Sequence, residues 1–328
     1  MKAVRFTVLV VLVQLLLAAC AAQPPVDYKS SAAPADKPEL DSAALISDLR
    51  TLSSPAFAGR LVGSDGSRLA QEYIKRRFDE IGLAPLGASH LTPFTFTRPA
   101  RNGKAEKTYP YAANLIGQIR GSVSPERYMV VSAHYDHLGV RDGKVYLGAD
   151  DNASGVAAML AVAAHFKKYP PHNTIIFAAF DAEEGGADGA NYFINSAPIP
   201  IEQVAVNLNF DMVSRNDNNE IFAAGTSYTP ALKILVAKAA ATSSVKVRLG
   251  HDSKPTGAAP DYDWTTQSDH VKFHERGIPF LYFGVEDHVD YHKPGDSFEK
   301  INLVFYAEVT RLLVSTAEIL DRNLDTLK

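Results

Sequence analysis

The chain has 328 residues, of which 46% are apolar and 21% charged, so it is long enough to bury the core of one large globular domain. Its 33 basic and 37 acidic residues give a formal net charge of −4. No basic block follows the pattern of a phosphate-binding surface, which argues against nucleic acid as a partner. Cys20 is the single cysteine, which excludes an internal disulfide framework and a thiolate metal cluster. A metal site in this chain must therefore use His, Asp and Glu.

The first 20 residues have the pattern of a bacterial export signal. Lys2 and Arg5 precede an apolar run from Phe6 to Ala19, which at about 14 residues is shorter than the roughly 20 needed to span a bilayer. The string Leu-Ala-Ala-Cys that ends at Cys20 resembles the lipobox, in which the cysteine becomes the first mature residue and carries diacylglycerol. We therefore expect a membrane anchor on Cys20, and the alternative is an ordinary cleaved signal with an incidental cysteine. Ala21 favours, by resemblance to Gram-negative sorting, an outer-membrane lipoprotein facing the periplasm.

Residues 21–39 are rich in Ala, Pro, Ser and Asp and lack apolar periodicity, which predicts a flexible linker. The remaining residues, 40–328, form the predicted globular domain. Asp41 and Ser42 can cap a first helix that runs to about Leu52. A second helix is predicted over Ser67 to Ile81, where Gly82 ends it.

Beyond these helices, strands and helices alternate. Short apolar or β-branched runs predict buried strands at Asn114–Ile119, Tyr128–Ala133, Thr174–Phe180, Val204–Phe210 and Pro279–Phe283. Helical patterns cover Ser154–Lys168, Ala187–Ser196, Thr229–Thr242 and Leu303–Leu320. This alternation predicts an α/β fold, a three-layer αβα sandwich around a mostly parallel mixed central sheet. A stretch rich in Pro, Gly, Asp and Thr, Gly250–Gln267, is predicted to be a long functional loop.

Imidazoles and carboxylates follow three of the predicted strands, where open α/β sheets place their ligand sites. The strand that ends at Ala133 leads into His134-Tyr135-Asp136-His137. The next predicted strands lead into Asp181-Ala182-Glu183-Glu184 and into Asp211. Zinc accepts imidazole nitrogen and carboxylate oxygen, so these residue types predict a site for metal-assisted hydrolysis.

A further carboxylate lies in the segment Gly148-Ala149-Asp150-Asp151-Asn152-Ala153-Ser154-Gly155. Its small residues let the backbone come close, and the segment leads directly into a predicted helix. One aspartate of this segment could therefore be presented at a fixed angle and join two ions.

These strings, together with Asn209-Phe210-Asp211-Met212 and Tyr291-His292, resemble in order and spacing the motif set of the co-catalytic zinc aminopeptidase family. This family includes secreted bacterial leucyl aminopeptidases, and its catalytic domain is similar to those of glutamate carboxypeptidase II and glutaminyl cyclase. The resemblance extends from about Leu40 to the C-terminus. It implies two Zn²⁺ ions bound to His134, Asp151, Glu184, Asp211 and His292.

The resemblance also implies individual roles. Asp151 bridges the two ions, His134 and Asp211 complete one, and Glu184 and His292 complete the other. Asp136 accepts the imidazole N–H of His134 and orients it.

Two catalytic roles and one open choice of metal ligand follow from the same resemblance. Glu183 is the general base that takes the proton of the attacking water and passes it to the leaving amine. Tyr291 corresponds to a tyrosine that, in some family members, donates to the oxyanion. His288 is the alternative to His292, whose spacing to the later Asp296 matches the family better.

Two further strings stay open. Ser268-Asp269-His270 resembles a family string and is either a wall or support of the pocket or a local hydrogen-bonding turn. Arg215 either binds a substrate carboxylate or is simply exposed. No role is predicted for His90, His137, His165, His172, His251 or His274.

The sequence thus predicts a metallopeptidase, most specifically an aminopeptidase that removes N-terminal residues from peptides. The alternatives on the same scaffold are a carboxypeptidase and a glutaminyl cyclase, which generally uses one zinc. A non-catalytic envelope binding protein, comparable to the transferrin receptor, is disfavoured because all five ligand positions are present.

Overall fold

The computed structural model describes residues 27–28, 37–100, 105–253 and 262–327. The predicted signal, residues 1–20, lies outside this part, as does most of the predicted linker. Residues 27 and 28 form strand β1 (Asp27–Tyr28), which pairs antiparallel with β11 (Lys246–Leu249). None of the described helices combines the length and the apolar character that crossing a membrane requires.

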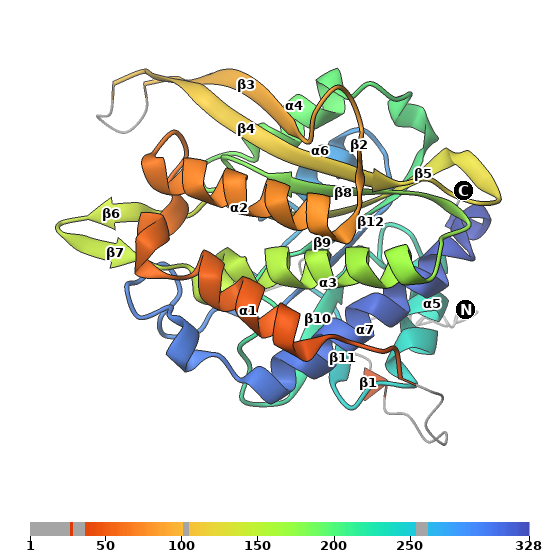
Figure 1. Cartoon of the computed structure of the whole chain (residues 1–328). Helices are drawn as coiled ribbons and strands as arrows, with labels where there is room; N and C mark the ends of the chain where they lie inside the picture. Colours follow the sequence, from red (N-terminus) through yellow and green to blue (C-terminus); the bar gives the residue numbers. More distant parts are fainter. Residues whose placement is uncertain (1–26, 29–36, 101–104, 254–261, 328) are drawn as a thin grey trace, which may run out of the picture.

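A mixed ten-stranded sheet runs through the molecule in the order β1-β11-β10-β12-β9-β5-β8-β4-β2, with β3 paired to β4 (Figure 1). Its centre consists of four mutually parallel neighbours: β12 (Phe280–Gly284), β9 (Val204–Phe210), β5 (Ser124–His134) and β8 (Asn173–Phe180). The outer strands are β10 (Glu220–Ala224), β4 (Lys107–Ile119), β3 (Leu91–Arg98) and β2 (Ala84–Pro85). A separate hairpin joins β6 (Gly139–Arg141) to β7 (Lys144–Tyr146).

Helices cover both faces of the sheet, which confirms the predicted three-layer fold (Figure 1). One face carries α1 (Ser42–Leu52), α2 (Asp65–Ile81), α3 (Gly155–Lys168), α5 (Ala231–Ala240) and α7 (Leu303–Asp321). The other face carries α4 (Asp188–Ser196) and the short α6 (His270–Glu275). Shorter helical turns are η1 (Pro55–Arg60), η2 (Ala149–Ser154), η3 (Ile201–Gln203), η4 (Phe298–Lys300) and η5 (Leu324–Leu327).

The central strands are buried on both faces because successive side chains point in opposite directions. In β5, Met129 and Val131 join the core under α3, whereas Tyr128 and Val130 join the core under α4 and α6. A continuous apolar run therefore fits each of these strands, and the same run would leave an exposed strand with an apolar surface.

Capping residues determine where the first two helices begin and where the second one ends. The Asp41 side chain accepts a hydrogen bond from the backbone N–H of Ala44 at 3.0 Å and starts α1 as predicted. Helix α2 starts at Asp65 rather than at Ser67, because the Ser64 hydroxyl accepts a hydrogen bond from the Ser67 N–H at 3.1 Å. Gly82 has a φ of 82°, the left-handed conformation in which glycine ends a helix at low cost.

Strands β3, β10 and β11 are not among the predicted strands, and β4 starts well before Asn114. They lie outside the parallel centre. In β3 and β11 buried residues are interrupted by more exposed ones, which weakens the apolar signal, whereas β10 is mostly buried but only five residues long. Pro93 within β3 is tolerated because β3 pairs with only one described strand, β4. The sequence therefore predicts the parallel centre of the sheet better than its edges.

Candidate metal centre

The predicted site residues lie together at the carboxyl ends of the parallel strands. His134 ends β5, Asp211 directly follows β9, and Glu183 and Glu184 follow β8. A cavity of about 530 Å³ opens over them, and its walls also include residues of the loops after β12 and before α6. Four neighbouring parallel strands thus bring polar side chains from distant parts of the chain together at one edge of the sheet.

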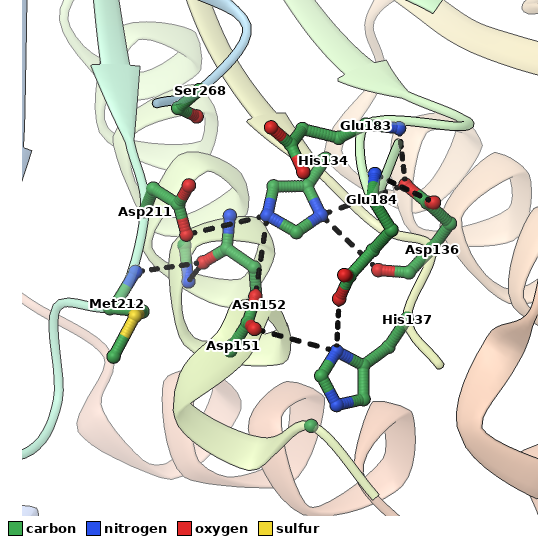
Figure 2. A network of polar contacts seen from close by, with 12 residues as sticks. His134, Asp136, His137, Asp151, Asn152, Glu183, Glu184, Asp211, Met212 and Ser268 are labelled. Carbon is green, nitrogen blue, oxygen red and sulfur yellow. Dashed lines mark hydrogen bonds and ion pairs between the residues drawn. The ribbon is translucent and has the colours of Figure 1, made fainter. Parts of the chain in front are cut away.

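Asp151 lies at the middle of the cluster, and Figure 2 shows its carboxylate in contact with His134 on one side and His137 on the other. Its Oδ1 is 3.4 Å from Nε2 of His134, and its Oδ2 is 3.1 Å from Nε2 of His292. Asp151 is only 4% exposed, and it precedes α3 in the turn η2. A carboxylate in this position can connect two half-sites.

The first half-site consists of His134, Asp151 and Asp211. The Nε2 of His134 is 3.3 Å from Oδ1 of Asp211. On the other side of the ring, Nδ1 of His134 is 3.2 Å from the backbone oxygen of Asp136 and 3.6 Å from its Oδ1. The main chain and side chain of Asp136 therefore orient the imidazole so that Nε2 faces the two carboxylates.

The second half-site consists of Asp151, Glu184 and His292, and the buried His137 lies close enough to the two carboxylates to be a further possible donor. Oε2 of Glu184 is 3.3 Å from Nε2 of His292. The alternative histidine, His288, is placed elsewhere, because its Nε2 is 3.3 Å from Oδ2 of Asp150. The structure therefore brings His292, and not His288, against the carboxylates of this half-site.

These donor separations fit divalent metal ions. Donors about 2.0–2.1 Å from one tetrahedral zinc lie roughly 3.3 Å from each other, and the pairs of His134 or His292 with the carboxylates of their half-site are separated by 3.1–3.4 Å. Although burial lowers the pKa of His292, Asp151 and Glu184 raise it to about 10. The raised pKa shows that the two carboxylates give this half-site an excess of negative charge. Such a site favours the binding of a divalent cation.

The segment that carries Asp151 is held by buried carboxylates of its own. Asp296 accepts hydrogen bonds from the backbone N–H groups of Asp150 and Asp151 at 3.0–3.1 Å. Asp150 in turn accepts from the N–H and hydroxyl of Ser214 at 2.8 and 2.6 Å. These contacts join the segment to the loops after β9 and β12 and fix the direction of the Asp151 side chain.

Glu183 borders the same cavity but lies in neither group of donors that could hold an ion. Its backbone N–H donates to Oδ1 of Asp136 at 3.0 Å, so one aspartate positions both His134 and the Glu183 segment. Burial raises the pKa of Glu183 well above its usual range, and Asp269 and Asp211 raise it further, whereas His134 opposes the shift. A carboxylate with a raised pKa is suited to accept and return a proton.

Arg98 of β3 fastens the turn that presents the two glutamates. Its guanidinium donates to the backbone oxygen of Ala182 at 3.1 Å and pairs with Asp188. A Cβ on Gly185 would lie 2.3 Å from this guanidinium, so a larger residue there would displace Arg98 from its present position. Ala182 itself has a φ of 61°, a left-handed conformation that is costly for alanine and is found at functional sites.

The structure places several residues whose roles the sequence left open. Tyr291 borders the cavity and stacks on the ring of His292, with centroids 4.0 Å apart. Ser268 is a cavity residue that accepts a hydrogen bond from Asn209 at 2.9 Å, so its string both lines and supports the pocket. Arg215 pairs with Asp290 at 2.5 Å and thereby holds the loop of His292 rather than pointing freely into solvent.

Sequence reasoning missed two fully buried residues. His137 lies beside Glu184, with Nδ1 2.6 Å from Oε1. Arg60, 1% exposed, donates to four backbone oxygens at 2.5–2.9 Å, those of Leu52, Tyr135, Leu147 and Gly148. In the sequence, the one feature that could have singled out Arg60 is the glycine beside it. His137 could have been found because it lies three residues after His134.

The fold and the site define a class: an α/β protein with imidazoles and carboxylates clustered at the ends of parallel strands. A model of peptidase family M28 matches residues 114–317, more than half of the chain. The chain belongs to peptidase family M28. The family resemblance inferred from the sequence motifs is thereby confirmed.

Curated relatives carry related names. The aminopeptidase YwaD of Bacillus subtilis is 31% identical over 207 residues, which are 58% of this chain and 40% of YwaD. A probable zinc metalloprotease of Pyrenophora tritici-repentis is 33% identical over 128 residues, 35% of this chain and 29% of that protein. The chain thus spans well under half the length of these relatives.

Solved structures share the fold. The zinc aminopeptidase BSAP of Bacillus subtilis has a TM-score of 0.68 at 17% identity, covering 86% of this chain and 96% of BSAP. A glutaminyl cyclase of Bacteroides thetaiotaomicron has a TM-score of 0.67 at 17% identity, covering 86% of this chain and 98% of that one. These likenesses confirm the α/β fold class.

Proposed function

We propose that this protein is a zinc-dependent aminopeptidase that removes N-terminal residues from peptides. The observation that carries the proposal is the position of Asp151, whose two oxygens face separate imidazoles at 3.4 and 3.1 Å. Membership of peptidase family M28 and the names of YwaD and BSAP support the same activity. Peptides are the proposed substrates.

In this proposal His134, Asp151 and Asp211 hold one Zn²⁺, and Asp151, Glu184 and His292 hold the other. When bound, the ions polarise the scissile carbonyl and lower the pKa of water. Glu183 accepts the proton of the attacking water and returns it to the leaving amine. Asp136 contacts both the imidazole of His134 and the backbone N–H of Glu183 and so holds the two residues in fixed positions relative to each other.

Tyrosine hydroxyls complete the proposed mechanism. Tyr291 borders the cavity and stacks on His292, which places its ring at the solvent side of the second half-site. Tyr282, also a cavity residue, donates to the backbone oxygen of Asp211 at 3.4 Å. Tyr291 is therefore the donor proposed for the oxyanion, and Tyr282 supports the segment of Asp211.

Release of p-nitroaniline from aminoacyl p-nitroanilides tests the activity. We expect release that a chelator abolishes and added zinc restores, because every step depends on residues arranged around the ions. The matched control substrate is the N-acetylated anilide, which an aminopeptidase leaves intact. Equal hydrolysis of the blocked substrate, or full activity without metal, would contradict the proposal.

A glutaminyl cyclase is the second candidate, because the Bacteroides enzyme shares the fold. Such an enzyme generally uses one zinc, whereas the described residues include donors for two half-sites that meet at Asp151. Metal analysis of the purified protein separates the two: close to two zinc ions per chain supports the peptidase, and one ion together with ammonia release from N-terminal glutamine supports the cyclase.

We further propose that the protein is exported and anchored by lipid on Cys20, at the outer membrane facing the periplasm. The support is the sequence of residues 1–20, with its basic start, apolar run and terminal Leu-Ala-Ala-Cys. Several acyl chains at one residue anchor firmly, since each buried methylene contributes roughly 0.8 kcal/mol.

Radioactive palmitate tests the anchor. We expect the natural chain to incorporate label and Cys20→Ser to incorporate none, because the thioether of the cysteine carries the lipid. Cys20→Ser should also move from the membrane fraction to the soluble fraction. Label that persists in the serine variant would refute the lipid anchor.

A further inference from the structure

We propose that the exposed face of α5 rests on the anionic lipid surface that holds the Cys20 anchor, so that the metal centre faces away from the membrane. This basic face consists of Lys233, Ile234 and Lys238. The inference rests on the proposed lipid anchor and goes beyond it, because an anchor alone does not orient the domain that it holds.

The pairing of β1 shows at which end of the sheet the chain leads back to Cys20. Asp27 lies opposite Arg248, and Tyr28 lies opposite Val247, so β1 runs antiparallel to β11. Because β11 is parallel to β10, and β10 is antiparallel to β12, the carboxyl end of β11 lies at the amino ends of the central strands. The chain before Asp27 therefore leads toward the end of the sheet that is opposite the metal centre.

The covalent chain limits how far this end can lie from the membrane. Asp27 comes seven residues after Cys20, and seven residues span at most about 25 Å. Lys37 comes 17 residues after Cys20 and could lie about 60 Å away if β1 were not paired. A domain of about 290 residues has a radius of gyration of about 19 Å. The pairing of β1 thus keeps one end of the domain near the lipid, whereas an unpaired linker would let the domain turn freely.

Helix α5 lies at the end of the molecule that this short connection holds. It follows the carboxyl end of β10 and leads back to the start of β11, so its first turns lie at the amino ends of the central strands. The hairpin of β6 and β7, which lies between His134 and Asp151 in the chain, is at the opposite end of the molecule (Figure 1). A lipid surface that contacts α5 is therefore remote from the metal centre.

The exposed side of α5 combines positive charge with an apolar side chain. The buried leucines and valine of the helix face the core, whereas Lys233, Ile234 and Lys238 are exposed, and Ile234 is 65% exposed. Ile234 and Lys238 are neighbours on the helix surface because they are four residues apart. Lysines beside an apolar residue are typical of helices that lie on a membrane surface.

The charges of the two lysines are available to a partner. Among the described residues, no ion pair includes either lysine. Acidic residues on the elements packed against α5 have partners of their own: Glu308 of α7 pairs with Lys37 at 2.6 Å, and Asp325 of η5 pairs with Arg127 at 3.4 Å. The basic face is therefore complementary to anionic phospholipid headgroups.

Fluorescence quenching from the lipid measures which end of the domain meets the membrane. The full lipidated chain is placed in vesicles of phosphatidylethanolamine and phosphatidylglycerol that carry a headgroup quencher. Because Cys20 is the single cysteine and carries the lipid, Ala237→Cys and Val140→Cys each accept one dye. Ala237 lies beside the basic face, and Val140, 52% exposed, lies in the hairpin of β6 and β7. We expect quenching of the dye at residue 237 and none at residue 140.

Charge reversal tests the lysines themselves. We expect Lys233→Glu combined with Lys238→Glu to lower the population of the contacting orientation by at least about 30-fold, because each lysine near an anionic surface contributes roughly fivefold. Quenching at residue 237 should then be lost. The matched control is Arg68→Glu combined with Lys75→Glu, which makes the same change of charge at exposed positions of α2 and should leave the quenching unchanged.

The outcomes separate the orientation from the anchor. A natural chain that takes up no palmitate and does not stay with the vesicles overturns both. An anchored chain whose dye at residue 140 is quenched as strongly as the dye at residue 237 overturns the orientation alone, as does a reversal on α5 with no greater effect than the reversal on α2. Circular dichroism verifies folding, and if the reversal on α5 fails to fold, the two dyes in chains with natural lysines decide.

Discussion

Glu183→Gln is expected to lower kcat by about 10²–10⁴-fold while the protein keeps its zinc content. Glutamine has the size of glutamate but cannot accept the proton of the attacking water. Glu183 lies in neither group of metal donors, so its loss should spare the ions. The measurement is kcat for an aminoacyl p-nitroanilide together with zinc per chain for the natural protein and the variant.

Glu275→Gln is the matched control. Glu275 also borders the cavity, but its side chain is 56% exposed and pairs with Lys272 at 3.2 Å. An exposed pair of this kind contributes little, so we expect activity close to that of the natural protein. Full activity in Glu183→Gln with normal zinc, or an equal loss in Glu275→Gln, would show that Glu183 is not the base.

Arg60→Met is expected to lower the free energy of unfolding by roughly 3–5 kcal/mol, because it leaves buried acceptors without donors and buried carboxylates without a nearby cation. The guanidinium joins the backbone oxygens of Tyr135 and of Leu147 and Gly148, which flank the segments of His134 and Asp151. Although burial lowers the pKa of Arg60 to about 10, Asp151, Asp296 and Asp136 oppose this shift. Arg60 therefore remains charged at neutral pH.

Denaturant unfolding of the metal-free protein measures this loss, with Arg68→Met as control. Arg68 lies on α2 with a side chain that is 58% exposed, and it pairs with Glu72 at 2.6 Å. We expect that control to change stability by no more than about 1 kcal/mol. Similar losses for both arginines would mean that the buried hydrogen bonds of Arg60 are not what holds the two segments.

Much of the site could be predicted because the signal is local. An apolar run makes a central strand, and the residue just after that strand lies at the ligand edge of the sheet, which places His134, Asp211 and the two glutamates. The helix after Asp151 could likewise be predicted from the local pattern of its residues. The outer strand β3 was not, because a partly exposed strand lacks a continuous apolar pattern.

The second half-site depended on more than local signal. His288 and His292 lie four residues apart in one loop, and periodicity does not distinguish them. The contacts of His288 with Asp150 and of Arg215 with Asp290 turn this loop so that His292 faces Glu184. These pairs join residues far apart in the chain, so their geometry exists only in the folded molecule.

The sequence by itself determined the α/β class, the parallel centre of the sheet and the residue types at its carboxyl edge, because strand formation and strand-end placement follow from short stretches of chain. Only the tertiary structure decided which histidine meets Glu184, that Arg60 ties two distant segments together, and that His137 lies behind the glutamate. The physical reason is that buried polar groups need partners, and the fold brings those partners from other strands and loops.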